Sequence, residues 1–454
     1  MLNFKTTISG LLAIVFCNLS IAQTKLIKTN EGFELHRNGA SYYVKGVGGE
    51  VNFDLMIEIG ANSFRTWGID NAEKILDEAQ SRGLTVMLGF WLQHERHGFD
   101  YDNAEKVKKQ FNHFKAAIDK FKNHPALLMW GIGNELDLEY TNPNVWYAVQ
   151  DLAKYAHQVD PNHPTSTVTA GLDSSEVSYI KARCPDIDIY CINTYGDIGN
   201  VPTNIKKFGW DGAYMITEWG PNGHWESPQT AWKVSIEQSS TEKYDVYLNR
   251  FKKYIEPNKN YCLGSYAFLW GAKQEYTETW YGLFSKENLP TEPIDALQEV
   301  FTQTPIAKPA AKILNFSIDE KTVIDNIKLK AQEKYKAKVD IQLPKDINEN
   351  QVKYRWRVLE ESSDKKSGGD VEEEATEING LILKGSKMAT IVFRAPQMPG
   401  NYRLLVSATC NGKVSYTNLP FQVFQREATD KQVQFIKAKY TDMKDFDHQK
   451  SFYD

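Results

Sequence analysis

Apolar residues recur with two different periods along this chain, and the change of period divides it into two predicted folded units. From about residue 25 to residue 303, short apolar segments alternate with amphipathic ones, a pattern that predicts strands separated by helices. The clearest helical stripe consists of Val107, Phe111, Phe114, Ile118 and Phe121. The predicted strands are Tyr42–Val47, Ser63–Trp67, Thr85–Trp91, Leu127–Gly133, Thr165–Ala170, Ile187–Asn193, Tyr214–Thr217 and Gly264–Trp270. Eight such units predict an α/β fold, a (β/α)8 TIM barrel over residues 24–303.

The second unit follows a stretch rich in Pro and Ala, residues 304–312, which we interpret as a linker. Beyond it the period becomes two, and Tyr354 and Trp356 alternate with charged residues, as on a strand with one buried face. Asn411-Gly412, between two such segments, indicates a tight hairpin turn. The pattern predicts a small all-β sandwich of the immunoglobulin type over residues 313–425, acting as a spacer or stability module.

Three further stretches show no regular period. The acidic stretch from Glu360 to Glu377 contains Ser and Gly and is predicted to be a loop. Residues 426–454 are highly charged and form either a short helix or a frayed tail. Residues 1–22 have a basic start, a short apolar run and small residues before Gln23, which is typical of a signal peptide. We therefore expect an exported protein, periplasmic or secreted.

Composition and charge narrow the range of partners. The formal net charge is -5 and the pI is about 6.1, so neither nucleic acid nor an anionic membrane surface is an expected partner. Outside the signal peptide, the sequence contains no apolar segment long enough for a membrane helix, so membrane insertion is not expected. The chain has 11 Trp and 23 Tyr. Such amphipathic rings suit stacking on sugars, and they equally suit the core of a large barrel.

Cysteine and histidine positions do not indicate a metal site. Removal of residues 1–22 leaves Cys184, Cys191, Cys262 and Cys410, whose spacing resembles no zinc site. We expect buried free thiols, with a disulfide as the alternative. The His and Glu residues of the segment Trp91–His97 form no recognisable set of ligands. No metal and no other cofactor is predicted.

The candidate chemistry lies at the ends of two predicted strands. In a (β/α)8 barrel, catalytic residues occupy the carboxyl ends of the strands. The fourth predicted strand leads into Asn134-Glu135, and the seventh leads into Glu218-Trp219. Because both strands belong to one ring, the two glutamates are expected to point into the same mouth of the barrel.

A pair of carboxyl groups is what glycoside hydrolysis requires. One attacks the anomeric carbon, while the other protonates the leaving oxygen and later activates water. A separation of about 5–5.5 Å gives retention of configuration, and about 6.5–9.5 Å gives inversion. The alternative for a single glutamate at a strand end is a salt bridge. Two such glutamates, the first preceded by Asn134, favour catalysis.

The motifs around these glutamates resemble those of the clan A glycoside hydrolases, and the resemblance covers the whole barrel region. Locally they are most similar to the barrel domain of glycoside hydrolase family 2. The segments that carry the resemblance are Trp130-Gly131-Ile132-Gly133-Asn134-Glu135, Ile216-Thr217-Glu218-Trp219-Gly220, Gly60-Ala61-Asn62-Ser63-Phe64-Arg65-Thr66-Trp67 and Asp188-Ile189-Tyr190-Cys191-Ile192-Asn193-Thr194-Tyr195. The resemblance implies a retaining β-glycosidase with Glu135 as acid/base and Glu218 as nucleophile.

The same resemblance implies roles for neighbouring residues. Arg65 and Tyr195 would lie beside the nucleophile, where a guanidinium favours the charged form of a carboxyl group. Asn134 would hold the sugar 2-hydroxyl, and Trp270 would floor the sugar subsite. Asn193, in the same motif as Tyr195, is a further candidate for substrate binding. The alternatives are a purely structural ion pair for Arg65, a core position for Tyr195 and ordinary packing for Trp270.

Two more segments are candidate walls of the substrate site. The polar and aromatic loop after the third predicted strand contributes Trp91 and His94. After the seventh strand, Trp219 and Trp225 form either further subsites or part of the core.

The order of the two units distinguishes this chain from typical family 2 enzymes, which usually carry a jelly roll and an immunoglobulin-like domain before the barrel. Here the small β-domain follows the barrel, an order that resembles the endo-β-1,3-glucanases of glycoside hydrolase family 158. The main prediction is therefore an endo-acting, retaining hydrolase of a β-linked polysaccharide or oligosaccharide, with laminarin-like β-1,3-glucan as first substrate. The alternatives are an exo-acting family 2-like enzyme of the β-galactosidase or β-glucuronidase type, a transglycosylase that uses the same glutamates, and a non-catalytic carbohydrate-binding protein.

Overall fold

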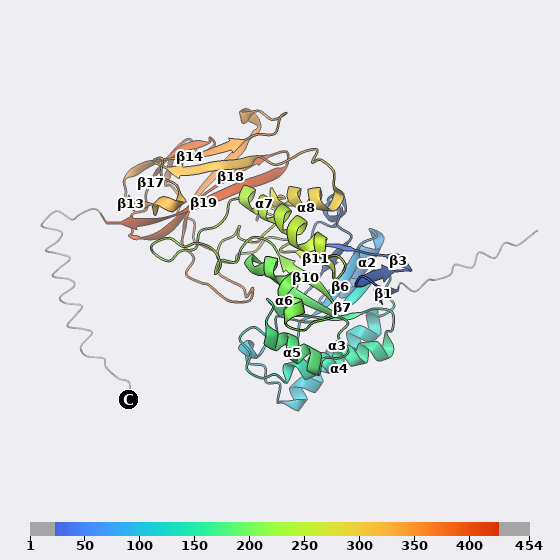
Figure 1. Cartoon of the computed structure of the whole chain (residues 1–454). Coiled ribbons are helices and arrows are strands. Elements are labelled where there is room, and N and C mark those ends of the chain that lie inside the picture. Colours follow the sequence, from blue (N-terminus) through green and yellow to red (C-terminus); the bar gives the residue numbers. More distant parts are fainter. Residues whose placement is uncertain (1–22, 426–454) are drawn as a thin grey trace, which may run out of the picture.

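A computed structural model describes residues 23–425, which form a closed barrel and a smaller β-sandwich beside it (Figure 1). The predicted signal peptide, residues 1–22, and the predicted charged tail, residues 426–454, lie outside the described residues. Within the described part of the chain, no helix is long and apolar enough to cross a membrane.

Eight parallel strands close the barrel in chain order, which confirms the predicted (β/α)8 fold. They are β4 (Val44–Gly48), β5 (Ser63–Arg65), β6 (Thr85–Phe90), β7 (Leu127–Asn134), β8 (Thr165–Ala170), β9 (Ile189–Asn193), β10 (Ala213–Trp219) and β11 (Cys262–Ala267). Every residue of β7 is buried, because a barrel strand has the barrel interior on one face and the helices on the other. A strand buried on both faces therefore appears in the sequence as a continuous apolar run.

Helices cover the outside of the barrel. They are α1 (Phe53–Glu58), α2 (Ala72–Ser81), α3 (Ala104–Phe121), α4 (Val145–Val159), α5 (Ser174–Arg183), α6 (Val201–Lys207), α7 (Ser240–Arg250) and α8 (Pro293–Thr302), with short helical turns η1 (Glu95–His97), η2 (Gly196–Asn200), η3 (Phe251–Ile255) and η4 (Glu256–Asn258). On α3, the predicted stripe supplies Phe114, Ile118 and Phe121 to the core. The predicted helical face is thus the buried one.

A small antiparallel sheet that the sequence pattern did not predict precedes the barrel. It comprises β1 (Thr24–Lys28), β2 (Phe33–Arg37) and β3 (Ala40–Ser41). Leu35 packs against apolar side chains of the barrel interior, and the Arg37 guanidinium donates to the carbonyl oxygen of Leu127 at 2.8 Å. Since Leu127 begins β7, this sheet lies at the amino ends of the barrel strands. It closes the end of the barrel opposite the carboxyl ends of the strands.

Two four-stranded sheets form the C-terminal sandwich, as predicted. One contains β12 (Lys312–Ile318), β14 (Lys334–Gln342), β17 (Thr390–Arg394) and β16 (Ile382–Lys384), and the other contains β13 (Lys328–Lys330), β19 (Lys413–Phe424), β18 (Gly400–Cys410) and β15 (Lys353–Glu360), with turns η5 (Val323–Asp325) and η6 (Glu349–Gln351). All pairs are antiparallel except β13 with β19. Trp356 packs in the core against Phe316 of the facing sheet. The predicted hairpin turn occurs at Asn411-Gly412, both in the left-handed region.

The sandwich packs on the barrel through buried charged and polar side chains. Lys243 of α7 pairs with Glu237 at 2.6 Å and donates to the Tyr416 hydroxyl of β19 at 3.3 Å. From β18, Arg403 donates to the carbonyl oxygen of Ser235 at 2.7 Å. Cys184, Cys191, Cys262 and Cys410 are buried free thiols in this structure.

Candidate active site

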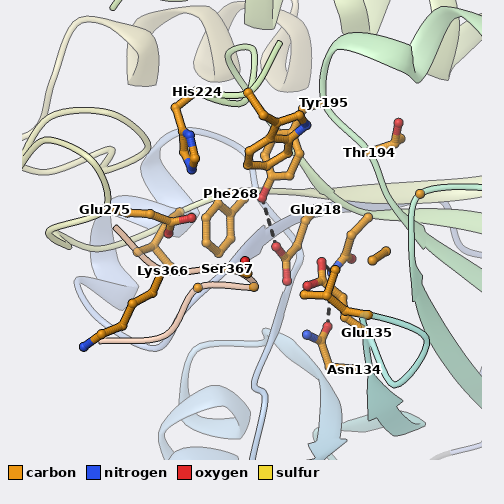
Figure 2. A pocket seen from close by; sticks show the side chains of 18 of the residues that line it. Asn134, Glu135, Thr194, Tyr195, Glu218, His224, Phe268, Glu275, Lys366 and Ser367 are labelled. Atoms are coloured by element: carbon orange, nitrogen blue, oxygen red, sulfur yellow. Dashed lines mark hydrogen bonds between the residues drawn. The ribbon is translucent and has the colours of Figure 1, made fainter. Parts of the chain in front are cut away.

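A cavity of about 620 Å³ opens at the carboxyl ends of the barrel strands, and both predicted catalytic glutamates line it (Figure 2). Glu218 is the penultimate residue of β10, and Glu135 directly follows β7. The geometric prediction that these residues converge on one site, although they are far apart in the chain, agrees with their shared cavity.

Three donors hold the Glu218 carboxylate. Trp67 Nε1 donates to Oε1 at 2.8 Å, and an Arg65 guanidinium nitrogen lies 3.4 Å from the same oxygen. The Tyr195 hydroxyl donates to Oε2 at 3.0 Å, as the dashed line in Figure 2 shows. Burial raises the pKa of Tyr195 well above its ordinary value, so the phenol keeps the proton that it donates. These three hydrogen bonds fix the orientation of the Glu218 carboxyl group in the cavity.

Glu135 lies in a contrasting environment. Burial and the nearby Glu218 carboxylate raise the pKa of Glu135 to about 8, because both disfavour the charged form. Asn193 Nδ2 donates to Glu135 Oε1 at 2.8 Å. At neutral pH Glu135 therefore retains its proton, as a general acid must.

Arg65 and Asn193 join the two glutamates into one network. Arg65 donates to Asn193 Oδ1 at 3.2 Å and to Asn134 Oδ1 at 2.8 Å. Asn193 Nδ2 donates to Asn134 Oδ1 at 3.1 Å as well as to Glu135. The buried guanidinium thus orients the residues around both carboxyl groups and contacts Glu218 itself.

Comparison with known families agrees with this arrangement. Residues 45–233 match the family described as "Glycosyl hydrolases family 2, TIM barrel domain". Over these residues the barrel of this chain is similar to the barrel of glycoside hydrolase family 2. The match includes Glu135 and Glu218 and ends before β11.

Curated relatives share part of their length with this chain. The β-glucuronidase of Chlorocebus aethiops is 23% identical over 284 residues, covering 58% of this chain and 39% of that protein. The β-glucuronidase of Paenibacillus borealis is 28% identical over 217 residues, covering 42% and 35% respectively. A solved structure, that of Bifidobacterium dentium β-glucuronidase complexed with coumarin-3-O-glucuronide, is 21% identical and covers 62% of this chain and 49% of that one, with a TM-score of 0.48. The chain thus spans less than half the length of these relatives.

Several of the predicted binding residues line the cavity that contains the two glutamates. These are Trp91, Asn134, Asn193 and Tyr195. Arg65 lies behind the cavity wall and acts on the site through its hydrogen bonds. His94 is buried outside the lining, and its Nε2 lies 2.8 Å from the carbonyl oxygen of Asn134.

Trp270 does not floor the cavity, contrary to the prediction. Its backbone N–H donates to Gly48 at 2.8 Å and its indole N–H to the carbonyl oxygen of Val51 at 2.6 Å, so the chain after β11 turns back toward β4. The side chain is 1% exposed and packs edge-on against Phe284. Phe268, two residues earlier, lines the cavity instead.

Trp219 also belongs to the core, which was the alternative to a substrate subsite. It is fully buried and packs against the rings of Tyr247 and Phe251 on the outer side of the barrel wall. Because side chains alternate along a strand, Glu218 faces the barrel mouth and its neighbour Trp219 faces the helices.

Sequence reasoning missed several lining residues. Trp67 belongs to one of the motifs that resemble family 2, but the motif gave it no role. It lies two residues after Arg65 in the predicted strand, so both side chains are expected on the same face. Lys273 and Glu275 follow β11 in an irregular segment, where no periodic signal places them. Four more lining residues come from the sandwich: Lys366, Ser367, Gly368 and Gly369. Among the described residues, no group of three or more His, Cys, Asp or Glu side chains is placed to hold a metal ion.

Proposed function

We propose that this protein is a retaining β-glycosidase in which Glu218 is the nucleophile and Glu135 the acid/base. The observation that carries the proposal is the pair itself. Both side chains line one cavity, Glu218 accepts hydrogen bonds from three donors, and Glu135 holds its proton at neutral pH. Opposite protonation of two carboxyl groups is the requirement for double displacement.

In the first step, a Glu218 oxygen attacks the anomeric carbon as the glycosidic bond breaks, and Glu135 gives its proton to the leaving oxygen. In the second, Glu135 takes a proton from water, whose oxygen attacks the same carbon and releases Glu218 as the carboxylate. The hydrogen bonds from Trp67 and Tyr195 orient Glu218 throughout. The net change is hydrolysis with retained configuration.

For the substrate, the comparisons favour the exo-acting family 2-like alternative over endo-β-1,3-glucan hydrolysis. The curated relatives described above are β-glucuronidases, whereas the endo-glucanase prediction rested on the order of the two units. We accordingly place release of a terminal β-linked sugar first, with β-glucuronides and β-galactosides as the first compounds to test.

Cleavage within an oligosaccharide is the second candidate. A neighbouring hollow of about 770 Å³ shares Trp67 and Trp91 with the catalytic cavity and adds Phe99. Aromatic faces of this kind suit sugar stacking, so the two hollows together offer room for more than one sugar. Transglycosylation would use the same intermediate and differs only in its products.

The test is the variant Glu218→Ala, assayed on a panel of aryl β-glycosides and on β-1,3-glucan, with products separated by size. Turnover should fall by about 10³-fold or more, because loss of the nucleophile removes the covalent path. Azide should restore product as a glycosyl azide of inverted configuration. Glu50→Ala is the matched control, since Glu50 follows β4 at the same rim but is exposed and does not line the cavity.

Each outcome separates the alternatives. Wild-type turnover in Glu218→Ala would refute the nucleophile assignment. Products longer than the substrate in the wild type would indicate transglycosylation. Cleavage within β-1,3-glucan chains would favour the endo-acting hypothesis. Tight oligosaccharide binding without any release of sugar would identify a non-catalytic binding protein.

A further inference from the structure

One segment of the sandwich reaches across to the barrel and forms part of the catalytic cavity. Residues 361–373 follow β15 and contain no helix or strand. Four of them, Lys366 to Gly369, line the cavity together with the two glutamates. Figure 2 shows Lys366 and Ser367 on the ribbon of this segment at the edge of the cavity. The sequence predicted a loop here but gave it no connection with the site.

Asp370 anchors this segment to the barrel. Its carboxylate accepts hydrogen bonds from both terminal nitrogens of Arg96, at 2.8 and 3.2 Å, and lies 3.0 Å from His97 Nε2. The Arg96 side chain is only 6% exposed, so this bidentate pair is largely shielded from water, where such pairs are strongest. Arg96 also donates to the carbonyl oxygens of Ser367 and Gly368.

Further contacts fix the path of the segment. Glu372 accepts from the backbone N–H of Tyr276 at 2.6 Å, and Lys273 donates to the carbonyl oxygen of Gly369 at 2.6 Å. Gly368 has a φ of 59°, and a Cβ atom there would lie 2.5 Å from Leu138. Since Leu138 belongs to the turn that follows Glu135, the segment lies directly against the acid/base side of the cavity.

A chain of hydrogen bonds connects Asp370 with the backbone before Glu135. Arg96 Nε donates to His94 Nδ1 at 3.2 Å, and His94 Nε2 lies 2.8 Å from the carbonyl oxygen of Asn134. Burial lowers the pKa of His94 to about 4, so the ring is neutral at neutral pH. Because Nδ1 accepts from Arg96, the ring proton is on Nε2 and is donated to Asn134.

On the basis of the proposed function, we propose that residues 361–373 form the wall of the leaving-group subsite and that Asp370 is a positioning residue for Glu135. The acid must deliver its proton to the leaving oxygen, so the leaving group lies on the side of Glu135. That side is covered by Leu138 and the segment. Asp370 holds Arg96, Arg96 fixes the His94 tautomer, and His94 holds the carbonyl oxygen of the residue before Glu135.

The test compares Asp370→Ala with the wild type on aryl glycosides of one sugar, the sugar that the wild type hydrolyses best, with leaving groups of different acidity. For phenyl as leaving group, kcat/KM should fall by about ten-fold, part of the 10²–10⁴-fold that general acid catalysis supplies. For dinitrophenyl, which departs without a proton, the change should stay within about two-fold. The alkaline limb of the pH profile should move to lower pH, because water entering the cavity reduces the desolvation of Glu135.

Two variants serve as controls. Arg355→Ala removes another ion pair between sandwich and barrel, that with Glu287, where both side chains are more than half exposed. It should leave both substrates and the pH profile unchanged. Asp370→Glu should restore the phenyl rate in part, and thermal unfolding should confirm that all variants are folded.

The proposal fails if Asp370→Ala loses activity equally on both substrates, or keeps the wild-type leaving-group dependence and pH profile. If the wild type itself hydrolyses no glycoside of the panel, the proposed function fails instead. The two failures are therefore distinguishable.

Discussion

The turn after β7 directs the Glu135 side chain into the cavity, and it requires an unusual backbone conformation. Glu135 has a φ of 51° and Gly133 a φ of 81°, both in the left-handed region. A Cβ atom at Gly133 would lie 2.4 Å from Leu136, so glycine is required where the strand ends. A non-glycine residue in this region is disfavoured and is kept where the surroundings impose it. Here the imposed turn brings the acid to the opposite carboxylate.

The raised pKa of Glu135 sets the alkaline limit of activity. Catalysis requires the protonated acid, so kcat/KM should be constant below pH 8 on this side of the profile and fall about ten-fold per pH unit above it. Glu135→Gln should lose this limb and at least 10²-fold of kcat/KM for poor leaving groups, with a smaller loss for dinitrophenyl. Measurement of kcat/KM from pH 5 to 10 checks both. A fall that begins below pH 6, or a limb that persists in the Gln variant, would contradict the assignment.

Substitution of two tryptophans distinguishes a hydrogen bond to the proposed nucleophile from ordinary packing in the core. Trp67→Phe keeps an aromatic wall but removes the 2.8 Å hydrogen bond to Glu218, so kcat should fall by about ten-fold or more, the scale of one hydrogen bond to a charged group. Trp270→Phe removes a hydrogen bond to a backbone carbonyl in the core. It should lower Tm and leave kcat within about two-fold. Equal losses of kcat in both variants would indicate that Trp270 is part of the substrate site.

At the scale of elements, the pattern of apolar residues predicts the strands that are buried on both faces. It fails where the chain forms no regular helix or strand. The barrel strands were predictable because apolar runs such as Leu127–Ile132 have few alternatives to a buried parallel strand. The sheet β1–β3 was missed because its strands are short and alternate weakly, with Leu35 its one fully buried apolar side chain. Trp270 was misplaced since its direction depends on the turn after β11, which no period describes.

The same distinction applies to the site. Glu135, Glu218, Asn134 and Tyr195 lie at or just after the carboxyl ends of strands, so the strand pattern places them at one mouth. By contrast, the segment 361–373 reaches the cavity only because the whole sandwich packs on the barrel. Its anchor, the pair of Asp370 with Arg96, joins residues more than 270 positions apart. Neither charge has a local signal that distinguishes it from the many solvated charges of the chain.

For the whole molecule, a buried charge network joins the two units. Glu237 accepts from Lys243 and from Asn418 of β19, at 2.6 and 2.5 Å. Arg403 pairs with Glu361, the first residue of the cavity segment, at 2.7 Å. Lys243 and Glu237 are no more than 2% exposed. Separation of the units would break the bonds between Glu237 and Asn418 and between Arg403 and the carbonyl oxygen of Ser235, and would expose these charged side chains to water. The sandwich is thus integral to the fold and to the site.

We therefore expect barrel and sandwich to unfold together in a single calorimetric transition, with activity lost at the same midpoint. Lys243→Met should lower the free energy of unfolding by about 3–5 kcal/mol, because Glu237 would be left as a buried charge without its cation. Urea unfolding followed by fluorescence measures this change. Activity should decline in parallel, since loosening of the interface withdraws residues 361–373 from the cavity.

Lys252→Met is the matched control, because Lys252 pairs with Glu299 at 2.9 Å while half of its side chain is exposed. Its loss should cost less than about 1 kcal/mol, the usual range for a surface pair. Two separate transitions in the wild type, with activity surviving the first, would show that the units are energetically independent. In that case the buried charges at the interface would not couple the unfolding of the two units. The position of residues 361–373 would then depend on Asp370 and its neighbours alone.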